Sequence, residues 1–276
     1  MLLAVDLGNT RLKCGLFSGR SLLHGFRAET RHDGSERHYA KSFQQALALQ
    51  CIEATAIDAA IIASVVPALT PPLLGAVRLA FGLEALSVGP ELATGLTLRG
   101  PNPLEVGADR LVNAAAAWSL GLEAAAREGR RASSGSLVVD LGTATKFDCV
   151  SPGGEFLGGV IAPGVSTSLE GLVARAARLQ PVELRAPARV LGITTVECMQ
   201  SGLIHGHAAL VDGLVARLRA EMPFECEVIG TGGFAELIAP HTEALRRLEP
   251  DLTLIGLQRI HARAAQAASG AYLPKS

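Results

Sequence analysis

Two short turns in the sequence each combine a carboxylate with a glycine and small polar side chains. The first lies in Val5–Thr10 (VDLGNT) and the second in Val139–Thr145 (VDLGTAT). Each follows an apolar run and leads into another, which is the pattern of a strand, a tight turn and a second strand. A carboxylate beside backbone and hydroxyl donors suits nucleotide phosphates and their metal ion. The repeat predicts a duplicated fold that holds a nucleoside triphosphate between its halves.

Asp6 and Asp140 occupy equivalent positions, at the ends of their predicted strands. An aspartate before a glycine also stabilises a turn without binding anything. The matched context of the two copies favours two ligand-binding carboxylates instead. In this interpretation the hydroxyls of Thr10, Thr143 and Thr145 add hydrogen-bond donors for phosphate oxygens.

A third candidate site, Gly107–Arg110 (GADR), lies between the two turns and directly before a helical segment. An aspartate at a helix start is also favoured by the helix dipole alone. Arg110, however, suits bidentate binding of a substrate carboxylate, and Asp109 would then be placed to accept a proton from a substrate hydroxyl. Lys13, a positive charge shortly after the first turn, could reach a phosphoryl group during transfer.

Three further motifs are ambiguous. Gly158–Gly164 and Gly230–Gly233 resemble nucleotide-binding turns, but they also fit tight connections between strands and helices. His205 and His207 lie two residues apart in a predicted helix, so they point to different faces and make a poor metal pair. We expect both histidines to be structural.

Composition favours a folded protein with a small polar ligand. The 276 residues are 49% hydrophobic and 18% charged, and 25 Lys and Arg nearly balance 26 Asp and Glu. This balance gives no field that would attract nucleic acid or an anionic membrane, so neither is an expected partner. No apolar run reaches the roughly 20 residues that span a bilayer.

Cysteine usage indicates a reducing compartment. Five cysteines are scattered along the chain without a CxxC pair, and the N-terminus shows no secretory signal. We therefore expect reduced core cysteines and a cytoplasmic location. The cysteines are Cys14, Cys51, Cys149, Cys198 and Cys226.

Strand-like and helix-like segments alternate in both halves, which predicts an α/β fold with mixed sheets flanked by helices. In the first half we expect strands at 2–5, 14–17, 59–66 and 85–88, helices at 72–81 and 111–127, and a loop at 99–105. After a polar hinge at 128–136, we expect strands at 137–139, 146–150, 156–161 and 227–229 and helices at 168–179, 195–221 and 257–268.

The motifs, taken in order, resemble those of the type III pantothenate kinases. The match covers nearly the whole chain and comprises Asp6–Thr10 with Lys13, Gly107–Arg110, Asp140–Thr145, Gly158–Gly164, Gly230–Gly233 and Leu252–Leu257. The resemblance implies the fold of the superfamily that includes acetate and sugar kinases and actin. It implies two ribonuclease-H-like domains, at 1–118 and 119–276, an active site in the cleft between them, and a homodimer.

The resemblance also implies an activity, which is ATP-dependent phosphorylation of pantothenate to 4′-phosphopantothenate, the first step of coenzyme A synthesis. Its cofactors would be Mg²⁺, bound by Asp6 through the phosphates, and a monovalent cation, K⁺ or NH₄⁺, bound by Asp140. ATP would be held by Asp6, Leu7, Gly8, Asn9, Thr10, Arg11, Leu12, Lys13 and Thr143. The pantothenate pocket would comprise Gly100, Gly107, Ala108, Asp109, Arg110 and Thr195, with Asp109 as the catalytic proton acceptor.

Three positions depart from the family pattern. Gly100 stands where a tyrosine usually helps to enclose pantothenate. Thr194 replaces an asparagine, whereas Thr195 keeps the substrate-contacting hydroxyl. Lys146 replaces the usual threonine after Gly-Thr-Ala-Thr, and it places a cation either near the nucleotide turn or on the opposite strand face in solvent.

Other functions remain open from the sequence. A kinase of another small hydroxy acid or sugar would keep both aspartate turns and act on a different acceptor. Loss of Asp6, Asp109 or Asp140 would favour a transcription-accessory relative with weak or no kinase activity, but all three are present and no basic stripe for DNA occurs. A chaperone-like ATPase would need more chain for a peptide-binding domain.

Overall fold

The structure is a computed structural model that describes residues 1–89, 92, 94–99, 105–129 and 133–268. The described chain forms two compact units. The first combines the residues up to Leu96 with the start of α3 (Ala108–Arg127), through Ala116, and with α7 (Leu252–Ala268). The second extends from Ala117 to Asp251 and includes the short strand β6 (Thr97–Leu98).

The first unit is built on a five-stranded mixed sheet in the order β3-β2-β1-β4-β5. The first three strands form an antiparallel meander, and β4 and β5 continue the sheet in parallel with β1. The predicted hairpin between the first two strands is confirmed, with Val5 opposite Cys14. The strands are β1 (Leu2–Leu7), β2 (Arg11–Ser18), β3 (Ser21–Glu29), β4 (Ala59–Ser64) and β5 (Leu86–Ser87).

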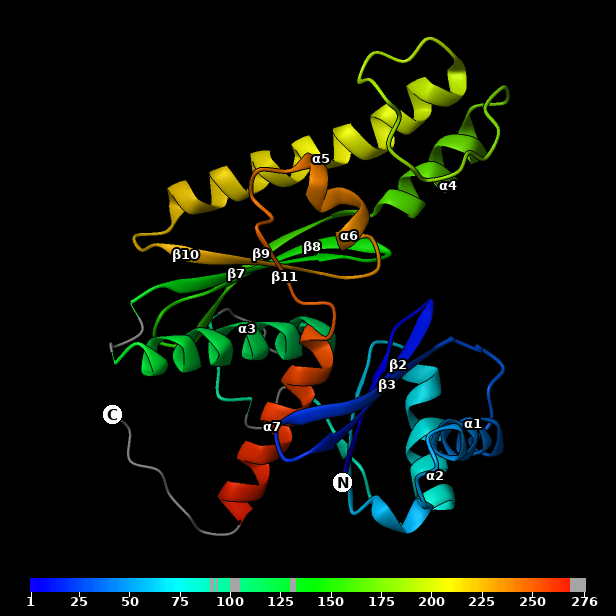
Figure 1. Ribbon diagram of the computed structural model, residues 1–276, viewed down its shortest axis with the longest axis vertical. Coiled ribbons are helices and arrows are strands. Elements are labelled where there is room, and N and C mark those ends of the chain that lie inside the picture. The colour runs from blue at the N-terminus through cyan, green and yellow to red at the C-terminus, as the bar shows by residue number, and fades with distance from the viewer. Residues whose placement is uncertain (90–91, 93, 100–104, 130–132, 269–276) are drawn as a thin grey trace. The chain divides into compact units, whose positions relative to one another are not determined.

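Helices cover both faces of this sheet (Figure 1). Side chains alternate along β1, so Leu3 and Val5 enter the apolar cluster under α1 (Glu36–Leu49) and α2 (Thr70–Phe81). The alternate residues of β1 pack on the other face, in a cluster that contains residues of α7 and the start of α3. The result is a three-layer unit in which β1 is buried on both sides. Two short 3₁₀ turns, η1 (Ala54–Ala56) and η2 (Pro67–Leu69), flank β4.

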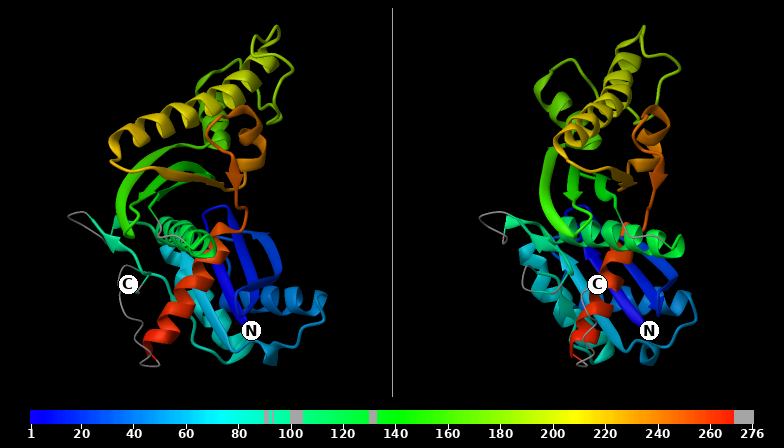
Figure 2. Two further views of the ribbon diagram at one scale, coloured as in Figure 1. Left: turned by 60° about the vertical axis from the view of Figure 1, so that its left-hand side comes forward. Right: turned by 90° about the vertical axis from the view of Figure 1, so that its left-hand side faces the viewer.

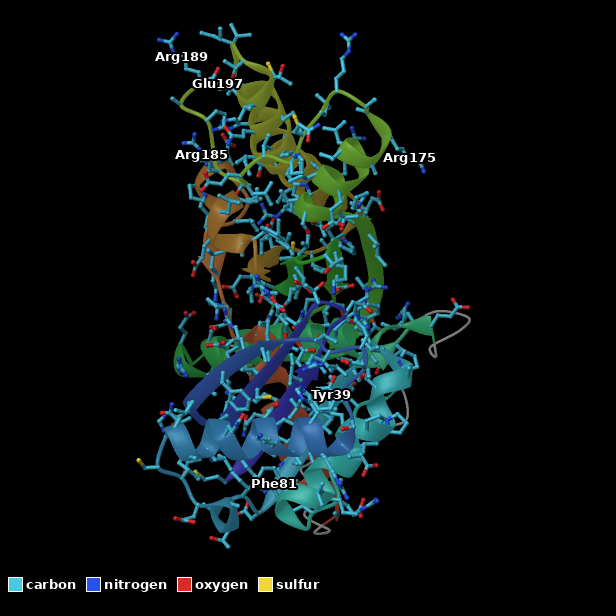
Figure 3. The ribbon with its side chains drawn as sticks, turned by 90° about the vertical axis from the view of Figure 1, so that its right-hand side faces the viewer. Tyr39, Phe81, Arg175, Arg185, Arg189 and Glu197 are labelled. Atoms are coloured by element: carbon cyan, nitrogen blue, oxygen red, sulfur yellow. The ribbon has the colours of Figure 1, made fainter. Side chains whose placement is uncertain are left out.

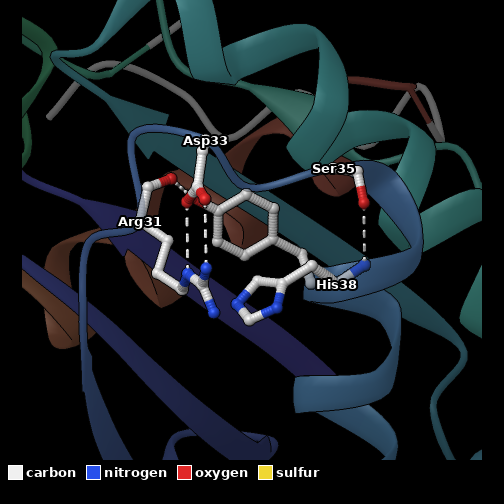
Figure 4. Close-up of polar contacts among 5 residues, drawn as sticks. Arg31, Asp33, Ser35 and His38 are labelled. Carbon is white, nitrogen blue, oxygen red and sulfur yellow. Dashed lines mark hydrogen bonds and ion pairs between the residues drawn. The ribbon is translucent and has the colours of Figure 1, made fainter.

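The loop that leads into α1 is held by its own polar contacts (Figure 4). Ser35 caps the helix, since its side chain accepts a hydrogen bond from the backbone N–H of His38. The hydroxyl of Tyr39 donates to the carbonyl of Arg31, and the guanidinium of Arg31 pairs with Asp33. The pairing with Arg31 lowers the pKa of the Asp33 carboxyl. These contacts fix the backbone directly before α1.

The second unit contains a six-stranded sheet in the order β11-β10-β7-β8-β9-β6. Here too three successive strands form an antiparallel meander, and β10 joins β7 in parallel as β4 joins β1. The duplication predicted from the repeated turns is therefore present in the topology. The strands are β7 (Gly135–Leu141), β8 (Ala144–Val150), β9 (Glu155–Pro163), β10 (Cys226–Thr231), β11 (Arg247–Leu248) and β6.

One face of this second sheet is covered by the long helix α5 (Thr195–Glu221), as Figures 1 and 2 show. Residues from α4 (Val165–Arg175) and α6 (Ala235–Ile238) join α5 in the apolar cluster on this face. A short 3₁₀ turn, η4 (Ala239–His241), follows α6. In α3, Trp118 donates its indole N–H to the carbonyl of Pro152, in the turn between β8 and β9.

Several elements differ from the sequence prediction. The bounds predicted for α5 agree with the structure, whereas β3, α1, β6, α6 and β11 were not predicted. Helix α7 begins at Leu252 rather than at 257, and it packs in the first unit, although the prediction placed it in the domain 119–276. It does so because Leu254 and Leu257 complete the apolar cluster of the first sheet. Within the described residues, no helix has both the length and the apolar character needed to cross a membrane.

Candidate active site

The first aspartate turn connects β1 and β2, the two strands of the hairpin. Asp6 lies directly opposite Lys13 in the strand register, so the two side chains project from the same face of the hairpin. The backbone N–H of Gly8 donates to the carbonyl of Arg11 at 2.9 Å and closes the turn between them. The half-buried carboxylate and the lysine can therefore face one ligand at the tip of the hairpin.

A second layer of residues supports this turn from the segment after β3. The hydroxyl of Thr30 donates to the carbonyl of Gly8 at 2.6 Å, and the backbone N–H of Thr30 donates to the carbonyl of Thr10 at 3.0 Å. Nε2 of His32 lies 3.1 Å from the carbonyl of Asn9. Three consecutive carbonyls of the turn are thus fixed from behind. Sequence reasoning did not identify Thr30 or His32, because neither belongs to a motif.

Replacing Thr30 by valine should loosen the first turn, because the substitution removes the hydroxyl that holds Gly8. We expect the Kd for Mg·ATP to rise by about fivefold, the effect of one hydrogen bond of about 1 kcal/mol. Calorimetric titration of Thr30→Val, Thr30→Ser and wild type measures this change. The serine variant should recover most of the affinity, and Thr55→Val, at an exposed position, is the control. Equal affinity in wild type and Thr30→Val would contradict a supporting role.

The Gly107–Arg110 motif begins α3 in the same unit. Oδ1 of Asp109 accepts a hydrogen bond from the backbone N–H of Arg110 at 2.9 Å. A Cβ atom on Gly107 would lie 2.7 Å from this oxygen and 4.0 Å from the side chain of Val65. Val65 in turn donates its backbone N–H to the carbonyl of Leu7 at 3.1 Å. Val65 therefore lies near the start of α3 and is hydrogen-bonded to the end of β1.

These contacts bring two of the predicted motifs together. Asp6 and Lys13 come from the hairpin, Asp109 and Arg110 come from the helix start, and Val65 lies near both. A carboxylate at the start of α3 is stabilised by the helix dipole, which was the simpler reading of Asp109. A carboxylate is also the kind of side chain that can serve as a general base for a hydroxyl. Gly100, which was also expected in this pocket, lies outside the described residues.

The second aspartate turn has a different electrostatic environment. Asp140 lies directly opposite Lys146 in the register of β7 and β8, and Nζ of Lys146 is 2.8 Å from Oδ2 of Asp140. Both side chains are largely buried, with 13% and 15% of their surfaces exposed. Lys146 was expected either near the nucleotide turn or on the opposite strand face in solvent. The structure places it at the turn.

Gly232 packs against the same carboxylate. It has a φ of +97°, and a Cβ atom there would lie 2.6 Å from Oδ1 of Asp140 and 2.5 Å from the carbonyl of Leu141. Only glycine fits this conformation and this close approach. Gly230–Gly233 was expected to be either a nucleotide-binding turn or a tight connection between elements. The structure shows a tight connection after β10, and this connection packs against the second aspartate turn.

The two threonines of the second turn have different environments. The carbonyl of Thr143 accepts hydrogen bonds from the backbone N–H of Gly164 and from the hydroxyl of Thr167. Thr145 is fully buried, and its hydroxyl lies 2.7 Å from Nε2 of His207 on α5. Burial lowers the pKa of His207, which favours a neutral imidazole. Thr145 therefore does not provide the phosphate donor that its place in the motif suggested, and His207 has the structural role expected of it.

Thr195 is the first residue of α5, in the second unit. Thr194 caps this helix, because its hydroxyl accepts from the backbone N–H of Glu197 and the Glu197 carboxylate accepts in return. Figure 3 shows Glu197 at the outer end of the unit, beyond the sheet. Thr195 is in the same helical turn as Glu197, so it also lies at this outer end. It does not belong to the turn after β7 that contains Asp140.

Solved structures of other proteins share the fold. A protein described as a Baf family transcriptional activator from Campylobacter jejuni aligns over 96% of this chain and 99% of its own, with a TM-score of 0.60 and 16% identity. Component A of (R)-2-hydroxyglutaryl-CoA dehydratase from Acidaminococcus fermentans aligns over 96% of this chain and 98% of its own, with a TM-score of 0.52 and 13% identity. At such identities the similarity concerns the fold alone.

Sequence relatives are closer. The family model for type III pantothenate kinase matches residues 2–217. A type III pantothenate kinase of Myxococcus xanthus is 41% identical over 263 residues, which cover 95% of this chain and 98% of the relative. The enzyme of the same name from Moorella thermoacetica is 40% identical over 95% of this chain and 99% of its own length. The chain belongs to the type III pantothenate kinase family.

Proposed function

We propose that this protein transfers the γ-phosphoryl group of ATP to pantothenate and forms 4′-phosphopantothenate and ADP. This reaction is the first step of coenzyme A synthesis. The observation that carries the proposal is the arrangement in the first unit, where Val65 lies near both the strand that ends at the turn of Asp6 and the helix start that contains Asp109. The names of the relatives, which align over almost their full length, support pantothenate as the acceptor.

In this proposal the nucleotide contacts Asp6–Lys13 and Thr143. The described residues contain no group of three or more His, Cys, Asp or Glu side chains that could hold a metal ion. Mg²⁺ fits at Asp6 nonetheless, because this ion usually binds through one or two carboxylates together with nucleotide phosphates. When bound, it neutralises charge on the phosphates. Lys13, opposite Asp6, would contact the phosphoryl group in transfer.

The acceptor would bind beside the start of α3. The guanidinium of Arg110 would bind the pantothenate carboxylate, and Gly107 and Ala108, directly before it in the chain, would line the pocket. Asp109 would accept the proton of the primary hydroxyl of pantothenate as the oxygen of this hydroxyl bonds to the γ-phosphorus. The bond from the γ-phosphorus to the bridging oxygen then breaks, and ADP leaves.

A monovalent cation does not fit at Asp140 in the way that the family resemblance implied. Oδ2 of this carboxylate already pairs with the ammonium of Lys146, and Gly232 lies so close to Oδ1 that a Cβ atom there would be 2.6 Å away. No step of the proposed reaction is therefore assigned to K⁺ or NH₄⁺.

The proposal includes a cytoplasmic homodimer. Supporting the location, the structure contains five free cysteines, and burial raises the pKa of Cys149 to about 12, which keeps this thiol protonated. Supporting the dimer, large apolar side chains are exposed beside the start of α5, with Leu191 83% and Ile193 87% exposed. Such side chains are expected to be covered by a second copy.

An acceptor panel tests the proposed function. ADP release by the purified protein with Mg²⁺ would be measured with pantothenate, glycerate, glucose and no acceptor. We expect kcat/KM for pantothenate to exceed that for the other acceptors at least about 100-fold, because a site that pairs with specific substrate groups rejects molecules that lack them. A higher kcat/KM with glycerate or glucose would indicate another small-molecule kinase. ADP release that does not depend on the acceptor would overturn the kinase assignment.

A further inference from the structure

The inference concerns the ion pair of the second turn. Asp140 is the last but one residue of β7, and Lys146 lies opposite it on β8. An exposed pair of this kind contributes little, because water screens both charges. This pair is only 13% and 15% exposed, so the ammonium and the carboxylate interact in a medium of low dielectric constant.

The surroundings of Asp140 leave the carboxylate little freedom to take another cation. Oδ2 is 2.8 Å from the Lys146 ammonium, and Oδ1 faces the backbone at Gly232, where a Cβ atom would approach to 2.6 Å. Directly after this strand, Gly142 lies close enough for a Cβ atom to be 3.7 Å from Oδ1. A free cation at Asp140 would have to displace the ammonium or lie close to a like charge.

The ammonium of Lys146 has the properties that a monovalent cation brings to such a site. It is a compact single positive charge with three N–H donors. It is tethered to β8, so it is held at the carboxylate without the entropy cost of capturing an ion from solution. It also neutralises Asp140, which would otherwise repel the phosphates of a nucleotide at the second turn.

We propose that Lys146 is a built-in monovalent cation, and that nucleotide binding by this chain therefore needs neither K⁺ nor NH₄⁺. This proposal rests on the proposed function only in so far as the second turn binds ATP. It assigns Lys146 a positioning role, since the lysine acts on the nucleotide through the charge and geometry of Asp140.

Cation dependence of nucleotide affinity is the direct test. The Kd of Mg·ADP would be measured by calorimetry in KCl and in tetramethylammonium chloride, whose cation is too large for the site. For wild type we expect the two values to agree within about twofold. In Lys146→Thr, which removes the ammonium and leaves room, we expect the Kd without K⁺ to rise at least about tenfold and to recover in KCl or NH₄Cl.

Two control variants separate charge from space. Lys146→Met removes the charge but fills most of the volume, so its weakened binding should not recover in KCl. Lys41→Thr, an exposed lysine on α1, should behave as wild type in both salts. Binding of Tl⁺, followed by ²⁰⁵Tl NMR, should appear in Lys146→Thr and not in wild type.

The possible outcomes distinguish this inference from the proposed function. A wild-type Kd that is at least tenfold weaker without K⁺, or Tl⁺ binding to wild type, would overturn the role of Lys146. The role of Lys146 would also be overturned if the Lys146→Thr variant bound Mg·ADP as tightly as wild type in tetramethylammonium chloride. Because the readout is binding, the result holds whether or not pantothenate proves to be the acceptor. If Lys146→Thr does not fold, the wild-type titrations and Lys146→Met still decide the question.

Discussion

Asp109→Asn should lower kcat for pantothenate phosphorylation by about 10²–10⁴-fold, the usual effect of removing a general base. Asparagine keeps the shape of the side chain, and its carbonyl oxygen can still accept the hydrogen bond from the backbone N–H of Arg110. It cannot accept a proton from the acceptor hydroxyl. Steady-state kinetics should therefore show a loss in kcat, with KM for ATP within about threefold of the wild-type value.

A second helix start in the same unit provides the matched control. Glu36 lies in the first turn of α1, as Asp109 lies in the first turn of α3. Glu36→Gln removes one negative charge from the same part of a helix, which costs about 0.3–1 kcal/mol of stability. It should leave kcat unchanged. If Asp109→Asn also kept its kcat within about threefold and lost only stability, Asp109 would be a structural residue of the helix start.

Gly232→Ala should lower the free energy of unfolding by at least about 2 kcal/mol and weaken Mg·ADP binding by about tenfold or more. A non-glycine residue at a φ of +97° is strained, and the added methyl group would collide with the carbonyl of Leu141 and with Oδ1 of Asp140. Neither atom can move without disturbing the second turn. Chemical denaturation and calorimetry measure the two effects.

Gly142→Ala is the stability control for this substitution. Its added Cβ would meet the carbonyl of Ala144 at 3.6 Å and Oδ1 of Asp140 at 3.7 Å, which are ordinary van der Waals distances. We expect its free energy of unfolding to stay within about 1 kcal/mol of the wild-type value. If Gly232→Ala were as stable as Gly142→Ala, the close approach of the β10 turn to Asp140 would not be required.

Local sequence patterns predicted the elements that position the first turn. The hairpin of β1 and β2 was predicted from the apolar runs at 2–5 and 14–17, and α5 was predicted from its long helical spacing. The sequence also predicted that Asp6 and Asp140 occupy equivalent positions. Each lies near the end of the first strand of a hairpin, and the two sheets repeat this hairpin. These features depend on residues that are close in the chain.

Other features could not be predicted because they depend on contacts between distant segments. The support of Gly8 by Thr30 spans two strands, and the packing of α7 on the first sheet joins the two ends of the chain. The ion pair of Asp140 and Lys146 could not be predicted for another reason. Lys146 could face either side of its strand until the register of β7 and β8 was known.

The most direct test of the central claim is the identity and amount of the product. Purified protein would be incubated with ATP, Mg²⁺ and pantothenate, and ADP and 4′-phosphopantothenate would be quantified together by mass spectrometry. The account predicts one 4′-phosphopantothenate for each ADP. ADP without 4′-phosphopantothenate would contradict it.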